Sequence, residues 1–204
     1  SVACGKSTLG KVILCEFPYE GSISCDEKEL RAMRDTERTG TIGYLGHDPE
    51  LFNDSVKNNI LMGENKNEDD FLKAVCLDQE VAGMEDGTET LVGNGGVRLS
   101  GGQGQRLALA RTLCHKKPVL ILDDPFSALD KTTERQIFAN LKELVRDNIV
   151  LLISHRLYLF PEMDQIIWME NGKAKVDTHE NLLREVPEYR ELFEEQEEKG
   201  GRES

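Results

Sequence analysis

The chain has 204 residues, of which 38% are hydrophobic and 31% charged, a composition typical of a soluble globular domain with a sizeable core. No apolar run approaches the roughly 18 to 20 residues of a membrane-spanning helix, and residues 1–10 lack the pattern of a secretory signal peptide. The formal net charge of -13 argues against binding to nucleic acid, whose phosphates must be neutralised by clustered Lys and Arg. We therefore expect no nucleic acid among the partners.

Two further features of the composition concern the cysteines and the end of the chain. The five cysteines form an odd set without a C-x-x-C pair, which argues against a disulfide framework or a zinc site and favours a reducing compartment. The acidic run at residues 194–204, EEQEEKGGRES, predicts a frayed and solvated end.

The chain starts with SVACGKSTLG, in which residues 5–8 correspond to the second half of the phosphate-binding pattern G-x-x-x-x-G-K-[ST]. The first glycine of that pattern falls just ahead of Ser1, so we expect the sequence to begin inside the loop. In such a loop, backbone N–H groups and the N-terminus of the next helix, expected over 7–14, surround a phosphate. Lys6 would reach the β- and γ-phosphates, and the Ser7 hydroxyl would join a magnesium shell. The alternative is a common surface tetrapeptide. The candidate phosphate-binding residues are Ser1, Ala3, Cys4, Gly5, Lys6, Ser7 and Thr8.

Short apolar runs alternate with helical patterns along the chain, which predicts an α/β fold with a mostly parallel sheet. Residues 52–112 are more polar and more helical than the rest, with helices expected over 69–77 and 103–115, and they read as a helical insertion in an α/β core. The runs 119–122 and 149–153 are dense and branched, as strands covered on both faces should be. Between them, Asp130 can cap a helix over 132–145. Residues 165–176 predict a hairpin with a type I′ turn at Asn171-Gly172.

Asp123 ends the apolar run VLILD, so its carboxylate is expected at the C-terminal edge of a buried strand, where open α/β sheets place their ligands. An acid at this place holds magnesium in P-loop nucleotide sites, usually through water. A single Asp that ends a strand is more often a simple turn residue. Together with Gly-Lys-Ser-Thr in the same chain, it favours a nucleotide-hydrolase fold with Ser7 and Asp123 as the magnesium ligands.

Residues 99–103 read LSGGQ and are followed by Gly-Gln-Arg. By itself, the SGGQ at residues 100–103 could be a plain glycine loop with a helix cap. Here, however, the order of motifs is phosphate loop, LSGGQ, VLILDD, SALD at 127–130 and Ser-His at 154–155. In this order the chain resembles the ATP-binding cassette (ABC) ATPases over nearly its whole length. LSGGQ also has a physical sense, because Ser100 can cap a helix whose exposed N–H groups favour an anion.

The resemblance implies one ABC ATPase domain over 1–204. It consists of a P-loop NTPase (RecA-like) core over 1–51 and 113–204, with the N-terminal strands missing, and a helical subdomain over 52–112 that carries LSGGQ. In the family, two such domains sandwich two ATP molecules, each between one phosphate loop and the other subunit's LSGGQ. Lys6 and the segment Ser100, Gly101, Gly102 and Gln103 would then serve different nucleotides. Asp130 matches the D-loop, which crosses that interface. His155 matches the switch histidine at the γ-phosphate, for which a core histidine is the alternative.

Three smaller segments resemble ABC exporters: 51–60, a Leu-Phe followed by a short helix; 90–96, just before LSGGQ; and 179–183, near the end. They imply ATP hydrolysis that powers export, with ATP and Mg²⁺ as cofactors, at the cytoplasmic face of a cell membrane. The implied partners are a second ABC ATPase domain and the transmembrane domains of the transporter. The alternatives are a soluble ABC ATPase that acts on nucleic acid or ribosomes, and an ATP-binding regulatory module without turnover.

Two residues depart from the family pattern. Asp124 stands where the family usually has the glutamate that polarises the attacking water, and its shorter side chain retracts the carboxylate by roughly an ångström. His47 stands where the Q-loop usually has a glutamine near magnesium, an ion that prefers oxygen ligands. With Lys6, Asp124, His47 and His155 as the catalytic candidates, these departures predict impaired hydrolysis at the chain's own site. Because LSGGQ is intact, they also predict a heterodimer with a more active partner.

Overall fold

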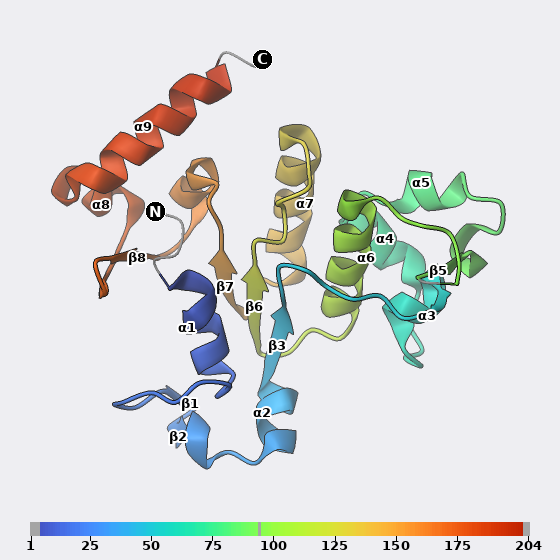
Figure 1. Ribbon diagram of the computed structural model, residues 1–204, viewed down its shortest axis with the longest axis horizontal. Helices are drawn as coiled ribbons and strands as arrows, with labels where there is room; N and C mark the ends of the chain where they lie inside the picture. The colour runs from blue at the N-terminus through green and yellow to red at the C-terminus, as the bar shows by residue number, and fades with distance from the viewer. Residues whose placement is uncertain (1–4, 94, 202–204) are drawn as a thin grey trace.

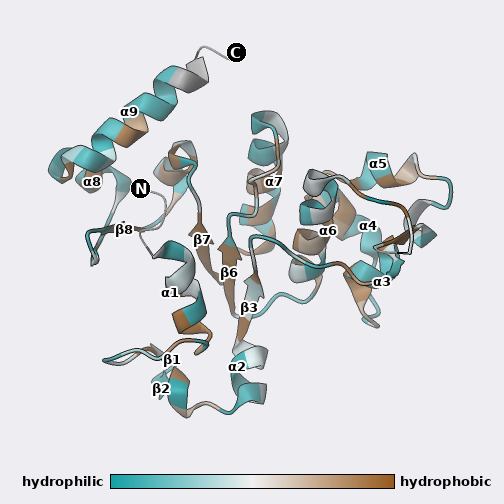
Figure 2. Ribbon diagram, in the orientation of Figure 1, coloured by the Kyte–Doolittle hydropathy of each residue, from teal (hydrophilic) through white to brown (hydrophobic). Residues whose placement is uncertain are grey.

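The computed structural model describes residues 5–93 and 95–201, and its centre is a parallel sheet in the order β3-β6-β7 (Figure 1). The strands are β3 (Ile42–Leu45), β6 (Val119–Asp123) and β7 (Ile149–Ile153). Val119 pairs with both Ile42 and Ile149, so the three strands start in register and end at the same edge. Strands β6 and β7 confirm the sequence prediction, and Figure 2 shows them as hydrophobic ribbons in the middle of the fold. The α/β class is thereby confirmed.

The sheet is covered on both faces, which explains why β6 is apolar at successive positions. On one face Ile121 and Ile153 pack with Ile13 and Leu14 at the end of α1 (Lys6–Ile13). Gly10 of α1 lies so close to the strands that an added Cβ would meet the Ile121 and Ile153 side chains at 3.4 Å. On the other face Leu120 and Leu122 belong to a larger core with helix α7 (Lys131–Leu144) and helix α6 (Gly101–Cys114).

The segment between β3 and β6 is mainly helical, as predicted. It contains β4 (Asp54–Ser55), α3 (Val56–Leu61), α4 (Glu68–Ala74), α5 (Asp78–Ala82), η2 (Gly87–Glu89), β5 (Leu91–Val92) and α6. The helix expected over 69–77 ends earlier, at Ala74, because Cys76 adopts a positive φ of 53° before α5 starts. Helix α6 runs through residue 112 to Cys114, and one hydrophobic core joins its side chains to β6 and α7. The boundaries 52 and 112 of a separate subdomain therefore stay a prediction.

Two smaller regions flank the sheet. Near the N-terminus lie β1 (Ser24–Cys25), β2 (Lys28–Glu29), η1 (Leu30–Ala32) and α2 (Asp35–Thr41). After β7 come η3 (Leu157–Glu162), β8 (Ile166–Glu170), β9 (Lys173–Asp177), α8 (His179–Glu185) and α9 (Pro187–Gly201). Asn171 and Gly172 both have positive φ values, 47° and 72°, which confirms the type I′ hairpin between β8 and β9.

The end of the chain differs from the sequence prediction. Residues 187–201 form helix α9 where a frayed end was expected from 194 onward, and Figure 2 shows this helix as mostly hydrophilic. Its first turns are anchored, because Tyr189 is buried in a cluster with Leu157, Ile166 and Leu182. Within the described part of the chain, none of the helices has both the length and the apolar character needed to cross a membrane.

Candidate active site

The candidate residues of the phosphate loop and of β6 meet where the parallel strands end. Gly5 precedes α1 with a φ of 93°, a left-handed conformation that favours glycine, and so turns the chain into the helix. Ser7 in the first turn donates a hydrogen bond from its hydroxyl to Asp123 Oδ1 at 3.1 Å. Thr8 follows it as an exposed residue, whereas Ser1, Ala3 and Cys4 lie outside the described residues. The structure thus brings together two side chains that lie 116 positions apart.

Asp123 is nearly buried, with 3% of its surface exposed, at the end of β6. The Tyr44 hydroxyl donates a hydrogen bond to Asp123 Oδ2 at 3.4 Å. Burial, and then the Asp123 carboxylate, raise the pKa of Tyr44. The hydroxyl of Ser7 and the carboxylate of Asp123 are oxygen donors of the kind that Mg²⁺ prefers, so the residues present fit this ion.

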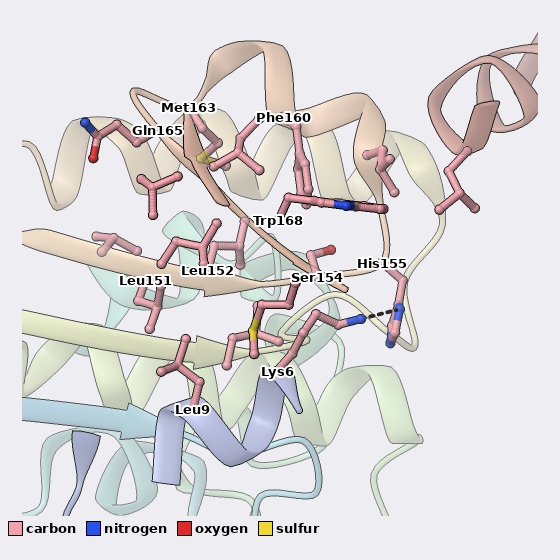
Figure 3. Close-up of a pocket in the computed structure, with 18 of the residues that line it drawn as sticks. Lys6, Leu9, Leu151, Leu152, Ser154, His155, Phe160, Met163, Gln165 and Trp168 are labelled. Atoms are coloured by element: carbon pink, nitrogen blue, oxygen red, sulfur yellow. Dashed lines mark hydrogen bonds between the residues drawn. The ribbon is translucent and has the colours of Figure 1, made fainter. Parts of the chain in front are cut away.

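Lys6 and His155 lie at the same edge, where Lys6 Nζ is 3.5 Å from His155 Nδ1 (Figure 3). His155 comes two residues after the end of β7, and its side chain is exposed rather than packed in the core. This placement disfavours the alternative of a core histidine. A cation from α1 and an imidazole from the loop after β7 therefore converge from two elements.

The two residues that depart from the family pattern face each other. His47, in the loop after β3, has its Nδ1 3.9 Å from Asp124 Oδ2, and the Asp124 side chain is the less exposed of the two at 14%. The Asp124 backbone N–H donates to the Ile153 carbonyl at 2.8 Å. Its φ is 51°, a left-handed conformation that Asp tolerates better than most residues. Both departures thus belong to one corner of the site, next to Asp123.

LSGGQ forms the N-terminus of α6, as the sequence predicts. The Gln103 N–H donates to Ser100 Oγ at 3.2 Å, and the Ser100 N–H donates to Gln103 Oε1 at 2.9 Å, a reciprocal capping box. Gly101 is exposed, and Gly102 lies so close to the backbone that an added Cβ would be 2.8 Å from the Ala128 carbonyl oxygen. Helices α6 and α1 pack on opposite faces of the sheet, so Ser100 and Lys6 belong to different sides of the fold.

The segment 124–130, called here the D-loop, connects these parts. Its last residue, Asp130, caps α7 by accepting hydrogen bonds from the N–H groups of Thr132 and Thr133, each at 3.0 Å. The bonds from Thr133 are the main reason why the pKa of Asp130 lies below its usual value. Asp130 therefore has a structural role, which confirms the predicted cap.

Two residues for which the sequence predicts no role, Gln105 and Arg156, hold the D-loop. Gln105 of α6 is buried and donates from Nε2 to the Asp124 carbonyl at 2.9 Å and to Ser127 Oγ at 3.0 Å. Arg156, next to His155, donates to the Phe126 carbonyl at 2.9 Å and to the Leu129 carbonyl at 3.3 Å. Neither residue carried a sequence signal of this role, since Gln105 stands among the polar and small residues Gln103, Gly104 and Arg106.

Arg156 also forms an ion pair with Glu134 of α7, whose side chain is fully buried. The Arg156 guanidinium is 2.8 Å from Glu134 Oε2. Burial raises the pKa of Glu134, although the Tyr158 hydroxyl and then this guanidinium lower it. The pair thus ties the loop after β7 to the first turn of α7.

Replacing Arg156 by Ala should destabilise the fold by about 3 kcal/mol at neutral pH, because it leaves a buried carboxylate without its partner. A raised pKa means that the folded state binds more protons than the unfolded state, so stability falls as the pH rises above the usual Glu value of 4.5. The loss should therefore shrink toward acid pH, as measured by urea unfolding at several pH values. The double variant with Glu134→Gln should recover part of the stability at neutral pH. A loss that is the same at every pH would contradict this assignment.

A cleft of about 450 Å³ opens between β7 and the β8 hairpin, beside Lys6 and His155 (Figure 3). Its walls are mainly apolar, with Leu9, Leu151, Met163 and Trp168 among the lining residues. Apolar walls do not match phosphate groups, so the chemistry of a nucleotide's phosphates belongs to the polar edge with Lys6, Ser7, Asp123 and His155.

Several known proteins resemble this chain in sequence and in fold. A sequence profile of the family described as ABC transporter matches residues 3–127. An export ATP-binding/permease protein of Rickettsia prowazekii is 32% identical over 198 residues, which cover 94% of this chain and 34% of that protein. An ATP-dependent lipid A-core flippase of Burkholderia pseudomallei is 37% identical over 193 residues, 92% of this chain and 32% of the flippase. The chain thus spans about a third of the length of these relatives.

Among solved structures, that of a bacterial Atm1-family ABC exporter with ATP bound superimposes with a TM-score of 0.88 at 31% identity. It covers 96% of this chain, and this chain covers 35% of the exporter. Domains of this family bind ATP and hydrolyse it as a class. With the family profile on more than half of its residues and the fold of an ABC exporter's ATP-binding part, the chain belongs to the ABC transporter family.

Proposed function

We propose that the chain is the nucleotide-binding domain of an ABC exporter, and that it binds Mg²⁺-ATP and hydrolyses it slowly at its own site. The observation that carries this proposal is the convergence of the Lys6 amine, the Ser7 hydroxyl, the Asp123 carboxylate and the His155 imidazole at the edge where β6 and β7 end. A cation, an oxygen-rich ion site and a helix N-terminus at one edge are the parts that a triphosphate needs.

The chain's residues would divide the chemistry as follows. Ser7 and Asp123 would hold Mg²⁺, which when bound neutralises the phosphate charge that develops in the reaction. Lys6 would neutralise the β- and γ-phosphates, and the N–H groups at the start of α1 would surround the β-phosphate. His155 would contact the γ-phosphate and orient the attacking water. Asp124 would accept a proton from that water.

The site should be slow because the proposed base, Asp124, and the Q-loop residue near the magnesium, His47, both depart from the family pattern. The Asp124 carboxylate is one methylene shorter than a glutamate, and a displacement of about an ångström can cost about a hundredfold in rate. At position 47 an imidazole, which is a poor magnesium ligand, replaces an amide oxygen. LSGGQ, in contrast, is intact and capped at the N-terminus of α6. We therefore propose a heterodimer in which Ser100, Gly101, Gly102 and Gln103 complete the more active site of a second ABC ATPase domain.

The proposed export function rests on the similarity of the chain to known exporters. Its relatives include proteins described as an export ATP-binding/permease protein and a lipid A-core flippase, and the superimposed structure is an exporter. We propose the same setting here, with transmembrane domains as partners at the cytoplasmic face of a membrane. The departures at Asp124 and His47 favour one second candidate, an ATP-binding regulatory subunit without turnover at its own site. Single-turnover hydrolysis of labelled ATP separates slow turnover from none.

The proposal is tested by replacing Asp123 with Asn in the intact protein. The variant keeps the size of the side chain and its place beside Ser7 but loses the charge that would hold Mg²⁺. Mg²⁺ should then no longer tighten ATP binding to this chain, with a loss of about tenfold or more in Mg²⁺-ATP affinity. Photolabelling of the chain with 8-azido-ATP, with and without Mg²⁺, measures this. A Mg²⁺ dependence of ATP binding that Asp123→Asn leaves unchanged would contradict the proposed site. Asp48→Asn, in the exposed loop after β3, is the matched control.

A further inference from the structure

We propose that Gln196 of helix α9 is a positioning residue for His155, so that the C-terminal helix sets the contact with the γ-phosphate. The proposal rests on the proposed function, in which His155 meets that phosphate. It concerns a helix that the sequence led us to expect as a solvated end.

Gln196 uses both halves of its amide on the loop that carries His155. Its Nε2 donates to the His155 carbonyl at 2.7 Å, and its Oε1 accepts from the Leu157 N–H at 2.9 Å. These two bonds bracket the His155–Leu157 segment and satisfy two backbone groups that have no strand partner after β7 ends at Ile153. A bidentate amide fixes position and direction more tightly than a single bond, because both contacts must be broken before the backbone can shift.

Helix α9 is itself fixed firmly enough to act as the anchor. Tyr189 is fully buried and packs edge-on against Trp168. Its hydroxyl shares a hydrogen bond with His179 Nδ1 at 2.7 Å. Leu192, one turn before Gln196, packs on the same cluster as Leu157 and lines the cleft beside Lys6 and His155. The path from the buried base of α9 to the His155 backbone is therefore a continuous set of contacts.

Arg156, the residue after His155, is held as well. Arg156 is bound to the D-loop carbonyls of Phe126 and Leu129 and to the buried Glu134. The segment 155–157 is thus held by the D-loop through the Arg156 side chain and by α9 through Gln196. Without Gln196, the His155 carbonyl and the Leu157 N–H lose these two bonds, while the Arg156 side-chain contacts and the bond from the Arg156 N–H to Ser154 Oγ at 3.0 Å remain. The His155 carbonyl and ring should then be able to move away from Lys6 and the phosphate.

The test uses Gln196→Met in the intact protein. Met keeps the length and the packing of the stem but makes neither hydrogen bond, so the fold should be retained. Competition by ATP and by ADP against photolabelling of this chain with 8-azido-ATP reports the two affinities separately. We expect Gln196→Met to lower the affinity for ATP about tenfold, which is about what one hydrogen bond to a charged phosphate contributes. ADP should compete as before, because it lacks the γ-phosphate. Gln136→Met on the exposed face of α7 is the matched control and should change neither affinity.

A double variant shows whether Gln196 acts through His155. If it does, His155→Ala lowers the affinity for ATP by at least as much as Gln196→Met does. Adding Gln196→Met to His155→Ala then changes the affinity no further. The role of Gln196 is wrong, while the proposed function stands, in either of two cases. In the first, His155→Ala lowers the affinity for ATP and Gln196→Met does not; in the second, the losses of affinity from the two substitutions add. If wild type is not labelled, or His155→Ala has no effect, the proposed function fails. In that case hydrogen exchange decides: faster exchange of the Leu157 amide in Gln196→Met supports the clamp, and equal exchange overturns it.

Discussion

Ser100→Arg should lower ATP hydrolysis by the assembled protein at least about a hundredfold, the loss seen when a group that stabilises transferring phosphate is removed. Ser100 caps α6, and the free N–H groups of this first turn are the part of the chain that would meet the partner domain's nucleotide. An arginine at this exposed position would fill the space in front of Gly101 and Gly102 and break the capping box. The measurement is the release of phosphate by the intact, assembled protein.

Ser100→Ala is the control for the cap alone. It should cost about 1 kcal/mol of stability through the lost hydrogen bond, but it leaves the space in front of the helix open. We therefore expect it to keep much more activity than Ser100→Arg. Equal and nearly full activity of both variants would mean that this helix N-terminus does not meet a nucleotide.

Asp124→Glu should raise hydrolysis at the chain's own site by about tenfold or more, because the longer side chain returns the carboxylate to the attacking water. The gain is best seen in a protein that also carries Ser100→Arg, since that change silences the partner's site and leaves only turnover at this chain's phosphate loop. Single-turnover hydrolysis of γ-³²P-labelled ATP is the measurement.

Two features limit the expected gain. Asp124 has a φ of 51°, which an aspartate tolerates better than a glutamate, so some of the benefit is offset by backbone strain. His47, 3.9 Å away, remains in place of the usual glutamine. Adding His47→Gln should therefore raise the rate further. A rate that neither substitution changes would mean that these two departures do not limit the site.

The parts of the fold that sequence predicted well are the ones that depend on local pattern. The strands around Ile121 and Leu151, the Asn171-Gly172 turn and the caps Ser100 and Asp130 each follow from a few neighbouring residues. Strand β3, in contrast, was not predicted. Its four residues include Gly43 and stand out only through their pairing with β6.

The parts that sequence missed depend on contacts between distant segments. Gln196 reaches the His155 backbone across 41 positions, and Arg156 reaches the Phe126 carbonyl across 30. A side chain that bonds to a distant backbone group has no periodicity and no motif, so only the tertiary structure reveals it. The sequence did predict that Asp124 and His47 depart from the pattern, but not that the two side chains face each other.

In the proposed heterodimer, this chain contributes to two nucleotide sites, and only its own site is weak. The most direct test compares steady-state ATP hydrolysis by the assembled protein carrying Asp124→Asn with that of the protein carrying Ser100→Arg. Asp124→Asn should keep most of the wild-type rate, because the partner's site carries the turnover, whereas Ser100→Arg should lose about a hundredfold. A loss with Asp124→Asn as large as that with Ser100→Arg would mean that the two sites do not differ in this way.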